Sequence, residues 1–421
     1  MIESVTLFPG VTLRCYTDNR FKQGCLSFQL IRPMCEEEAA LNALLPAVLL
    51  RGTRNNPDLR SITDRLDDLY GASVGALVRR IGDYQTTGLH CAFMEDRFAL
   101  EGDAIFAPMV AFLRELLLDP VLEDGVFCRE FVEGEKKNLI ATIDSERNDK
   151  RAYASAQLLR SMCRADSFGV PRLGSREAVA QITPEALYRH YGRILRTSAI
   201  ELFYVGSATA GQVKALVQPL LQDLDRDYVN LPAQTPFHFV EGEHLTEQME
   251  ITQAKLCMGF LTEITNTSPE FAAMQEYNTL FGGGMTSKLF MNVREKLSLC
   301  YSIGSGYYGS KGLVTVSAGI DTDKEPQTRQ EILSQLTACQ TGDFSHEELT
   351  AAKEAIISSL RGVTDSPGAI ENYYGTALLS GLSMSVPEYL EAVSAVTAEA
   401  VVAAAKTVRL HSSFFLKGVT A

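Results

Sequence analysis

The second half of the sequence repeats a pattern found in the first half, and this repeat constrains the fold more than any other feature. Leu69-Tyr70-Gly71-Ala72-Ser73-Val74-Gly75 follows a predicted helix and precedes a predicted strand. Leu299-Cys300-Tyr301-Ser302-Ile303-Gly304 has the same place later in the chain, with Tyr, Ser and Gly at nearly matching offsets. Because strands and helices come in clusters and do not alternate strictly, we expect two similar α+β domains, each an antiparallel sheet backed by helices.

Hydrophobic periodicity predicts the main elements on both sides of this repeat. Strands are expected over residues 11–16, 25–30, 74–80, 86–93, 199–205, 257–261, 300–307, 313–320 and 414–417. Helices are expected over residues 36–50, 57–69, 98–118, 125–164, 184–195, 210–224, 269–281, 286–296, 327–341 and 346–361.

A polar stretch with little periodicity separates the two halves. Residues 225–250 contain Pro232, Pro236, Gly242 and several charges, a composition typical of an interdomain linker. We therefore predict an N-terminal domain over residues 1–224 and a C-terminal domain over residues 251–421.

Composition excludes several classes of protein. The 421 residues include 39 Lys and Arg against 52 Asp and Glu, a net charge of −13, and no Trp, which argues against nucleic-acid binding. The apolar run Leu44–Leu50 is far too short for a membrane span. The acidic start of the chain does not resemble a signal peptide, so we expect a cytoplasmic protein. Nine scattered cysteines without a CxxC pair indicate reduced thiols.

A glycine-rich turn and the helix after it carry the strongest signal in the chain. Residues 281–302 read FGGGMTSKLFMNVREKLSLCYS. This segment closely resembles the C-terminal domain of the pitrilysin/insulinase family of metallopeptidases, the inverzincins. In active members, the resemblance implies, the residue at Arg294 holds a substrate carbonyl and the hydroxyl at Tyr301 donates to the developing oxyanion. Gly282, Gly283 and Gly284 are expected to form a turn with positive φ, to which the resemblance adds contact with the substrate.

The segment that ends in Gly52-Thr53 resembles the zinc helix of the same family, where HxxEH precedes a short apolar run and Gly-Thr. Counting back, the two His positions are Ala43 and Ala47, and the Glu position is Pro46. A methyl group offers no lone pair to zinc, and proline has no side-chain proton acceptor for a general base.

The third zinc ligand of the family falls in the long helix around residue 140. The family pattern places it at Thr142, while a shifted alignment would use Glu133 or Glu135. One carboxylate alone would not hold zinc, so the sequence predicts a degenerate metal site and no cofactor.

The resemblance covers essentially the whole chain and implies half of a clamshell particle. Members without the zinc motif are commonly non-catalytic subunits, as in the mitochondrial processing peptidase and in bacterial two-subunit enzymes. The leading hypothesis is therefore a non-catalytic subunit that binds peptide and supplies Arg294 and Tyr301 in trans to a homologous HxxEH-bearing partner.

Two other functions stay open at this stage. The chain would be a catalytically inactive, homodimeric peptide-binding or scaffold protein if Arg294 only binds helix carbonyls and Tyr301 is only a core aromatic. A stand-alone hydrolase would need unusual zinc ligands such as His238 and His244, which the flanking Pro and Gly residues place on a linker. A phosphate-binding loop is disfavoured because Gly282–Gly284 is not followed by the GK[ST] pattern.

Overall fold

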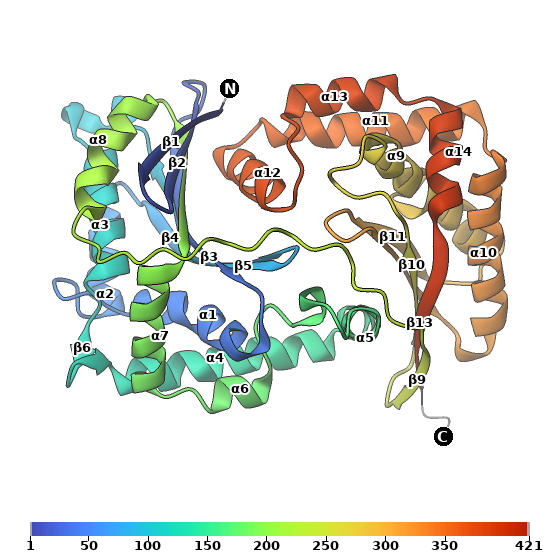
Figure 1. Ribbon diagram of the computed structural model, residues 1–421, viewed down its shortest axis with the longest axis horizontal. Coiled ribbons are helices and arrows are strands. Elements are labelled where there is room, and N and C mark those ends of the chain that lie inside the picture. The colour runs from blue at the N-terminus through green and yellow to red at the C-terminus, as the bar shows by residue number, and fades with distance from the viewer. Residues whose placement is uncertain (1, 419–421) are drawn as a thin grey trace. The chain divides into compact units, whose positions relative to one another are not determined.

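The computed structural model describes residues 2–418, which divide into two compact units. Unit 1 comprises the chain up to Asp144, Val170–Ala233 and Thr364–Thr376, and unit 2 comprises Ser145–Gly169, Gln234–Val363 and the chain from Ala377. Each unit is built on a β-sheet with helices packed against it (Figure 1). The chain therefore contributes separate segments to each unit.

The first half of the chain supplies the strands and most of the helices of unit 1. The strands are β1 (Ile2–Phe8), β2 (Val11–Thr17), β3 (Gln23–Pro33), β4 (Ser73–Ile81), β5 (Tyr84–Met94), β6 (Leu122–Glu123), β7 (Val126–Phe127) and β8 (Ala199–Gly206). The helices of this half are α1 (Glu36–Leu49), α2 (Leu59–Asp68), α3 (Phe106–Leu118), α4 (Arg129–Asn148), α5 (Lys150–Met162), α6 (Arg176–Ala180), α7 (Pro184–Thr197) and α8 (Ala210–Leu221).

The second half adds five strands and further helices to the part of the chain that is described. The strands are β9 (His244–Met249), β10 (Ala254–Leu261), β11 (Ser302–Tyr308), β12 (Leu313–Ile320) and β13 (Arg409–Gly418). The helices are α9 (Phe271–Gly282), the π-helix η4 (Leu289–Lys296), α10 (Glu325–Thr341), α11 (His346–Val363), α12 (Pro367–Leu379), α13 (Val386–Ala395) and α14 (Ala398–Thr407). Short 3₁₀ turns are η1 (Asp96–Phe98), η2 (Leu100–Gly102), η3 (Ser167–Gly169) and η5 (Thr322–Lys324).

The two sheets have the same strand order. Unit 1 has the order β1-β2-β8-β3-β5-β4, and unit 2, read from its β9 edge, has the order β9-β13-β10-β12-β11. In both, one pair is parallel, β2 with β8 and β9 with β13, and the remaining pairs are antiparallel. The α+β prediction is confirmed, and the expectation of purely antiparallel sheets is corrected to mixed sheets. Unit 1 differs by the additional strand β1.

One face of each sheet packs against helices to form the main core of its unit. In unit 1, Leu26, Phe28 and Leu30 of β3 point to this face and join a cluster with apolar residues of α1, α3, α7 and α8. In unit 2, alternate residues of β10 do the same with α9, α10, α11 and α14. The period of two along each strand fixes these inward positions.

On the other face of each sheet lies a helix from the opposite half of the sequence. In unit 2, α5 packs on β10 and β13 (Figure 1) and buries Leu158 and Met162 there. In unit 1, residues 364–376, which include most of α12, lie against the sheet through Glu371.

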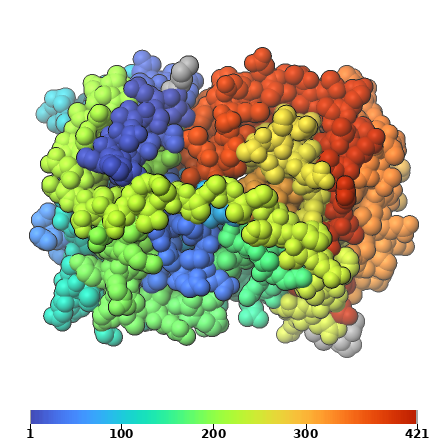
Figure 2. Space-filling view, in the orientation of Figure 1, coloured from blue at the N-terminus to red at the C-terminus, as the bar shows by residue number. Residues whose placement is uncertain are grey.

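Residues 225–243 form no helix or strand and lie at the surface. In Figure 2 this segment is yellow-green, and no other part of the chain lies over it in the view that is drawn. In unit 1 the Tyr84 hydroxyl donates to the carbonyl of Pro232 at 2.6 Å. In unit 2 Lys311 donates to the carbonyl of Thr235 at 3.0 Å and pairs with Asp166 at 3.1 Å. These contacts hold the segment along both units.

Within residues 2–418, no helix combines the length and the apolar composition that crossing a bilayer requires.

Candidate functional site

The glycine-rich turn lies at the C-terminal end of α9, where neighbouring atoms pack closely against Gly282 and Gly283. A Cβ at Gly282 would lie 2.7 Å from the Ser305 side chain, and one at Gly283 would lie 2.7 Å from the Cα of Thr279. None of the three glycines is among those with positive φ, and Gly283 has φ −81°. The expectation of a left-handed turn is therefore wrong, because lack of space for a side chain explains Gly282 and Gly283. Gly284 lies in open space.

Arg294 projects from a helix of unusual form. Residues Leu289–Lys296 form a π-helix, and its buried residues are Leu289 and Val293. The Arg294 guanidinium lies 4.6 Å from the centre of the Phe290 ring and 3.2 Å from the Glu295 carboxylate. π-Helical turns are rare and are found frequently at functional sites. The two contacts hold Arg294 at the surface.

Tyr301 lies directly before β11, with 57% of its surface exposed. Its backbone N–H donates to the carbonyl of Gly319 at 2.8 Å, which fixes the residue to β12. Its hydroxyl donates to the Asp321 carboxylate at 2.9 Å. This hydrogen bond raises the pKa of Tyr301 above its usual value. Tyr301 is therefore not a core aromatic, and its proton is held by a carboxylate.

Arg294 and Tyr301 line one open cavity of about 420 Å³ in unit 2. Lys324 also lines it and pairs with Asp321 at 3.0 Å. Burial raises the pKa of Cys300 in its wall to about 11, although Arg294 and Lys324 lie nearby, so this thiol stays protonated at neutral pH. The cavity presents a phenol, two cations and the Glu295 carboxylate, and the phenol and the cations suit a carbonyl oxygen or an anion.

Sequence reasoning does not identify Asp321 and Lys324 as members of this site. Asp321 follows β12 directly, and the turn η5 brings Lys324 back toward it. The signal that could have found Asp321 is its place just after β12, because β12 pairs with the strand that Tyr301 precedes.

The zinc-helix positions lie on α1 in unit 1. Ala43 and Pro46 are buried, and Ala47 is half-buried. The helix continues through Pro46, and the carbonyl of Pro46 accepts a hydrogen bond from Leu50 N–H at 3.2 Å. The side chains at these positions pack as apolar groups.

Thr142, the position assigned to the third ligand, lies exposed on α4 and donates to the carbonyl of Asn138 at 3.0 Å. Of the alternatives on the same helix, Glu135 pairs with Arg51 at 3.1 Å and Glu133 with Lys136 at 3.0 Å. In the described chain, no group of three or more His, Cys, Asp or Glu side chains is placed to bind a metal ion.

His238 and His244 make separate contacts. His238 Nδ1 lies 3.2 Å from the carbonyl of Ala165, and His244 Nδ1 lies 2.9 Å from the Ser413 hydroxyl. Each ring is held by its own hydrogen bond.

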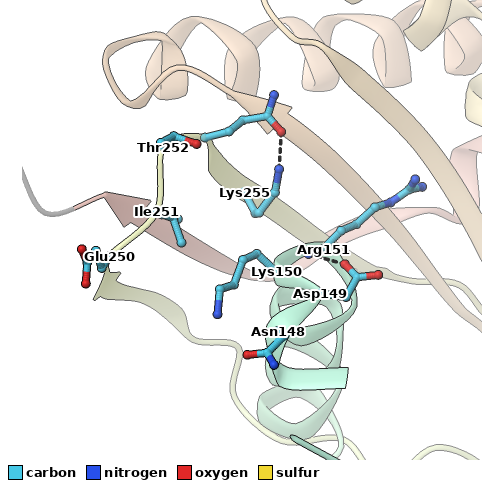
Figure 3. Close-up of a pocket in the computed structure, with 9 residues that line it drawn as sticks. Asn148, Asp149, Lys150, Arg151, Glu250, Ile251, Thr252 and Lys255 are labelled. Carbon is cyan, nitrogen blue, oxygen red and sulfur yellow. Dashed lines mark hydrogen bonds between the residues drawn. The ribbon is translucent and has the colours of Figure 1, made fainter. Parts of the chain in front are cut away.

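A second cavity of about 770 Å³ lies between the start of α5 and residues 250–255. Figure 3 shows the side chains of Lys150 and Arg151 leaving the helix in different directions. Asp149 caps α5 by accepting from the N–H of Arg151 at 3.0 Å, and Lys255 donates to Gln253. Because its charges diverge or are paired within the chain, this cavity does not present a convergent set of groups.

Comparison with known proteins finds relatives whose names refer to peptidases or metalloproteases. Residues 181–356 match the family model described as "Peptidase M16 inactive domain". A Bacillus subtilis (strain 168) protein named "Probable inactive metalloprotease YmfF" is 28% identical over 409 residues, which cover 97% of this chain and 96% of that protein. In the same strain, "Uncharacterized zinc protease YmxG" is 25% identical over 243 residues, 56% of this chain and 57% of that protein.

A solved structure shares the fold over the full length. The crystal structure of a conserved protein from Enterococcus faecalis V583 has a TM-score of 0.92 and 28% identity, and the match covers 100% of this chain and 99% of that one.

Proposed function

The chain belongs to the M16 peptidase inactive-domain family, and from this premise we propose that it is the non-catalytic subunit of a zinc peptidase. It pairs with a homologous chain that bears HxxEH, binds the peptide substrate, and supplies Arg294 and Tyr301 in trans to the partner's zinc site. A catalytically inactive, homodimeric peptide-binding protein is the competing function.

The observation that carries the proposal is the shared cavity of Arg294 and Tyr301. The side chains of Arg294 and Tyr301 are open to solvent at a cavity of about 420 Å³, and Arg294 is a residue of the π-helix η4. Polar groups buried in the core are normally hydrogen-bonded there, whereas polar groups that line an open cavity can meet a ligand. Two polar side chains held at a cavity are better suited to a ligand.

The metal side of the reaction must come from another chain under this proposal. Ala43, Pro46 and Ala47 supply no nitrogen or oxygen side-chain donor where the family has its zinc ligands and base. The Bacillus subtilis relatives support pairing, because that organism carries both a relative named inactive and a relative named a zinc protease.

An edge strand next to the cavity offers a way to hold peptide. β11 pairs with β12 on one side and ends the sheet of unit 2 on the other, as far as the described residues go. Ser302, Gly304 and Gly306 are small residues along it, so an extended peptide can approach its backbone and add a strand. The peptide would then run past Tyr301 and Arg294.

In the assembled site the Tyr301 hydroxyl exchanges its acceptor. In the free chain it donates to Asp321, and Lys324 also pairs with that carboxylate. When a substrate carbonyl develops negative charge, the hydroxyl can donate to that oxygen while Lys324 continues to neutralise Asp321. A donor that is needed only as charge develops lowers the barrier more than it strengthens substrate binding.

The first experiment identifies the partner. The tagged full chain is purified gently from the source cells, and the proteins that accompany it are identified by mass spectrometry. We expect a stoichiometric chain of similar length with HxxEH. Recovery of the chain alone, or with a second copy of itself and without peptidase activity, would support the competing function.

The second experiment tests Tyr301 in the assembled enzyme. Tyr301→Phe should lower kcat by about 10- to 1000-fold, the range for loss of one oxyanion donor, and leave assembly unchanged. The matched control is Tyr188→Phe, a tyrosine of unit 1 that packs edge-on against Phe127. Unchanged turnover in a correctly assembled Tyr301→Phe complex would remove the role proposed for this residue.

A further inference from the structure

A carboxylate from α12 is buried on the second face of the unit 1 sheet. Glu371 is 1% exposed. Its Oε1 accepts from the Ser27 hydroxyl at 2.8 Å, from Gln29 Nε2 at 3.2 Å and from Arg79 at 3.1 Å, while Oε2 accepts from Arg79 at 2.7 Å. The carboxylate thus receives four hydrogen bonds from two strands.

The three donor side chains form a cradle that the sheet itself holds in place. Ser27 and Gln29 are two residues apart on β3 and so share a face, and Arg79 stands on β4. The Arg79 guanidinium binds both carboxylate oxygens, a fork that matches the planar shape of a carboxylate. β5 separates β3 from β4, and it carries His90 opposite Ser27 and Gly88, which has no side chain, opposite Gln29.

α12 does not satisfy all the buried polar groups on the surrounding face of the sheet. Gln29 Oε1 and Glu201 Oε1 have no hydrogen-bond partner within the described chain, although their residues are only 1% and 5% exposed. Burial raises the pKa of Glu201 in spite of its ion pair with Arg14. Buried acceptors are normally bonded in a permanent core, so two of them beside the cradle indicate a surface made for a larger polar ligand.

We propose that Arg79, Ser27 and Gln29 form a carboxylate-binding site for an acidic peptide segment, and that α12 occupies this site with Glu371 in the free chain. A peptide longer than the contact made by α12 can also donate backbone N–H groups to Gln29 Oε1 and Glu201 Oε1. The site lies in unit 1 and is measured on the free chain, so it stands or falls separately from the role of Arg294 and Tyr301.

The chain carries its own reporters for release of α12. Cys25 lies on the same face of β3 as Ser27 and is 1% exposed, and burial together with the charge of Glu371 raises the pKa of its thiol. Cys257 lies under α5 in unit 2 and is fully buried. Labelling of these two thiols by a maleimide, located by mass spectrometry, separates opening of α12 from general unfolding.

The first test uses Glu371→Ala, with Asn372→Ala at the exposed neighbouring position as the control. Loss of hydrogen bonds to a charged group should raise the labelling rate of Cys25 by about 10- to 100-fold and leave Cys257 unchanged. An unchanged Cys25 rate, or equal increases at Cys25 and Cys257, would overturn the proposal. In the wild-type chain, where folding is not in question, the amides of α12 should exchange with deuterium at least about tenfold faster than those of α5. Equal protection would also contradict it.

The second test supplies the ligand from outside. The probe is a fluorescent peptide with the sequence of residues 366–376, which contains Glu371. We expect it to bind the Glu371→Ala chain at least about tenfold more tightly than the wild type, where α12 competes. Replacing Glu by Gln in the peptide, or Arg79→Gln in the chain, should abolish this gain. Equal binding of the Glu and Gln peptides, or no binding to the opened chain, would overturn the assignment of a carboxylate site.

Discussion

The two sheets share one strand order, but their second faces are closed by different chemistry. In unit 1, α12 is held by a carboxylate among polar side chains. In unit 2, α5 is held by Leu158 and Met162 in an apolar cluster. The contrast shows that a duplicated sheet can receive either a polar cover, which water or a ligand can replace, or an apolar cover, whose release would expose hydrophobic surface.

Three alternate positions on the central strand account for the difference. The second-face positions are Cys25, Ser27 and Gln29 on β3 and Lys255, Cys257 and Gly259 on β10. A Cβ at Gly259 would overlap the sulfur of Met162, so the absence of a side chain allows α5 to lie close to the strand. At the matching position Gln29 reaches Glu371. The fold is retained while the cover changes from packing to hydrogen bonding.

The largest effect is expected from Leu158→Ala on α5. Leu158 is 1% exposed in the apolar cluster, so its truncation should lower the free energy of unfolding by about 3 to 4 kcal/mol. Urea denaturation measures the loss, and Arg160→Ala, at an exposed position of the same helix, should leave the stability within about 0.5 kcal/mol. A loss below about 1 kcal/mol would mean that apolar packing does not hold α5 on its sheet, and the proposed difference between α5 and α12 would be wrong.

A somewhat smaller effect is expected from Gly259→Val on β10. The added atoms overlap Met162, and overpacking of this kind should cost about 2 to 3 kcal/mol. The double variant Gly259→Val, Met162→Ala should lose less than the sum of the two single variants, because the smaller side chain returns the space. Gly75→Val on β4 is the matched control, since a Cβ there meets no atom within 4 Å. Additive losses would show that α5 is not packed against this position.

The family and the repeated domain could be predicted from sequence because both depend on local patterns. The segment around Arg294 and Tyr301 is continuous in sequence, and the α+β sheets follow from alternation, with β12 found at residues 313–320 as expected. β9 could not be predicted, because His244–Met249 is mostly polar and exposed and becomes a strand only by pairing with β13. The period of a π-helix is likewise not visible in the eight residues of η4.

The carboxylate cradle lies beyond sequence reasoning for a different reason. Glu371 is 292 residues from Arg79 and 344 from Ser27 in sequence, and each of these residues is ordinary in its own segment. Only the fold brings them together. The catalytic roles of Arg294 and Tyr301, and the substrate-binding role of Gly282, Gly283 and Gly284, stay predictions.

A buried carboxylate of unit 2 adds to the comparison between the units. Glu276 of α9 is fully buried in unit 2, and neither of its carboxylate oxygens has a hydrogen-bond partner in the part of the chain that the structure describes. Burial raises its pKa from 4.5 to about 7, although Lys353 at 4.0 Å favours the charged form. Glu371 receives four hydrogen bonds, whereas Glu276 has none, so the charged state of Glu276 destabilises the unit that contains it.

The last prediction follows from this difference and has the smallest effect. Since the pKa of Glu276 is higher in the folded chain than in the unfolded one, the folded chain holds the extra proton between about pH 4.5 and 7. The free energy of unfolding should therefore fall by about 2 kcal/mol as the pH rises from 5 to 8, and Glu276→Gln should remove most of this fall. Urea denaturation of both chains at the two pH values measures it. Glu276→Gln does not change the packing of α12 or α5 on its sheet, so the labelling rates of Cys25 and Cys257 should stay as in the wild type. A fall of the same size in the Glu276→Gln variant would assign the pH dependence to other groups. A changed labelling rate of Cys25 would show that Glu276 and Glu371 are not independent.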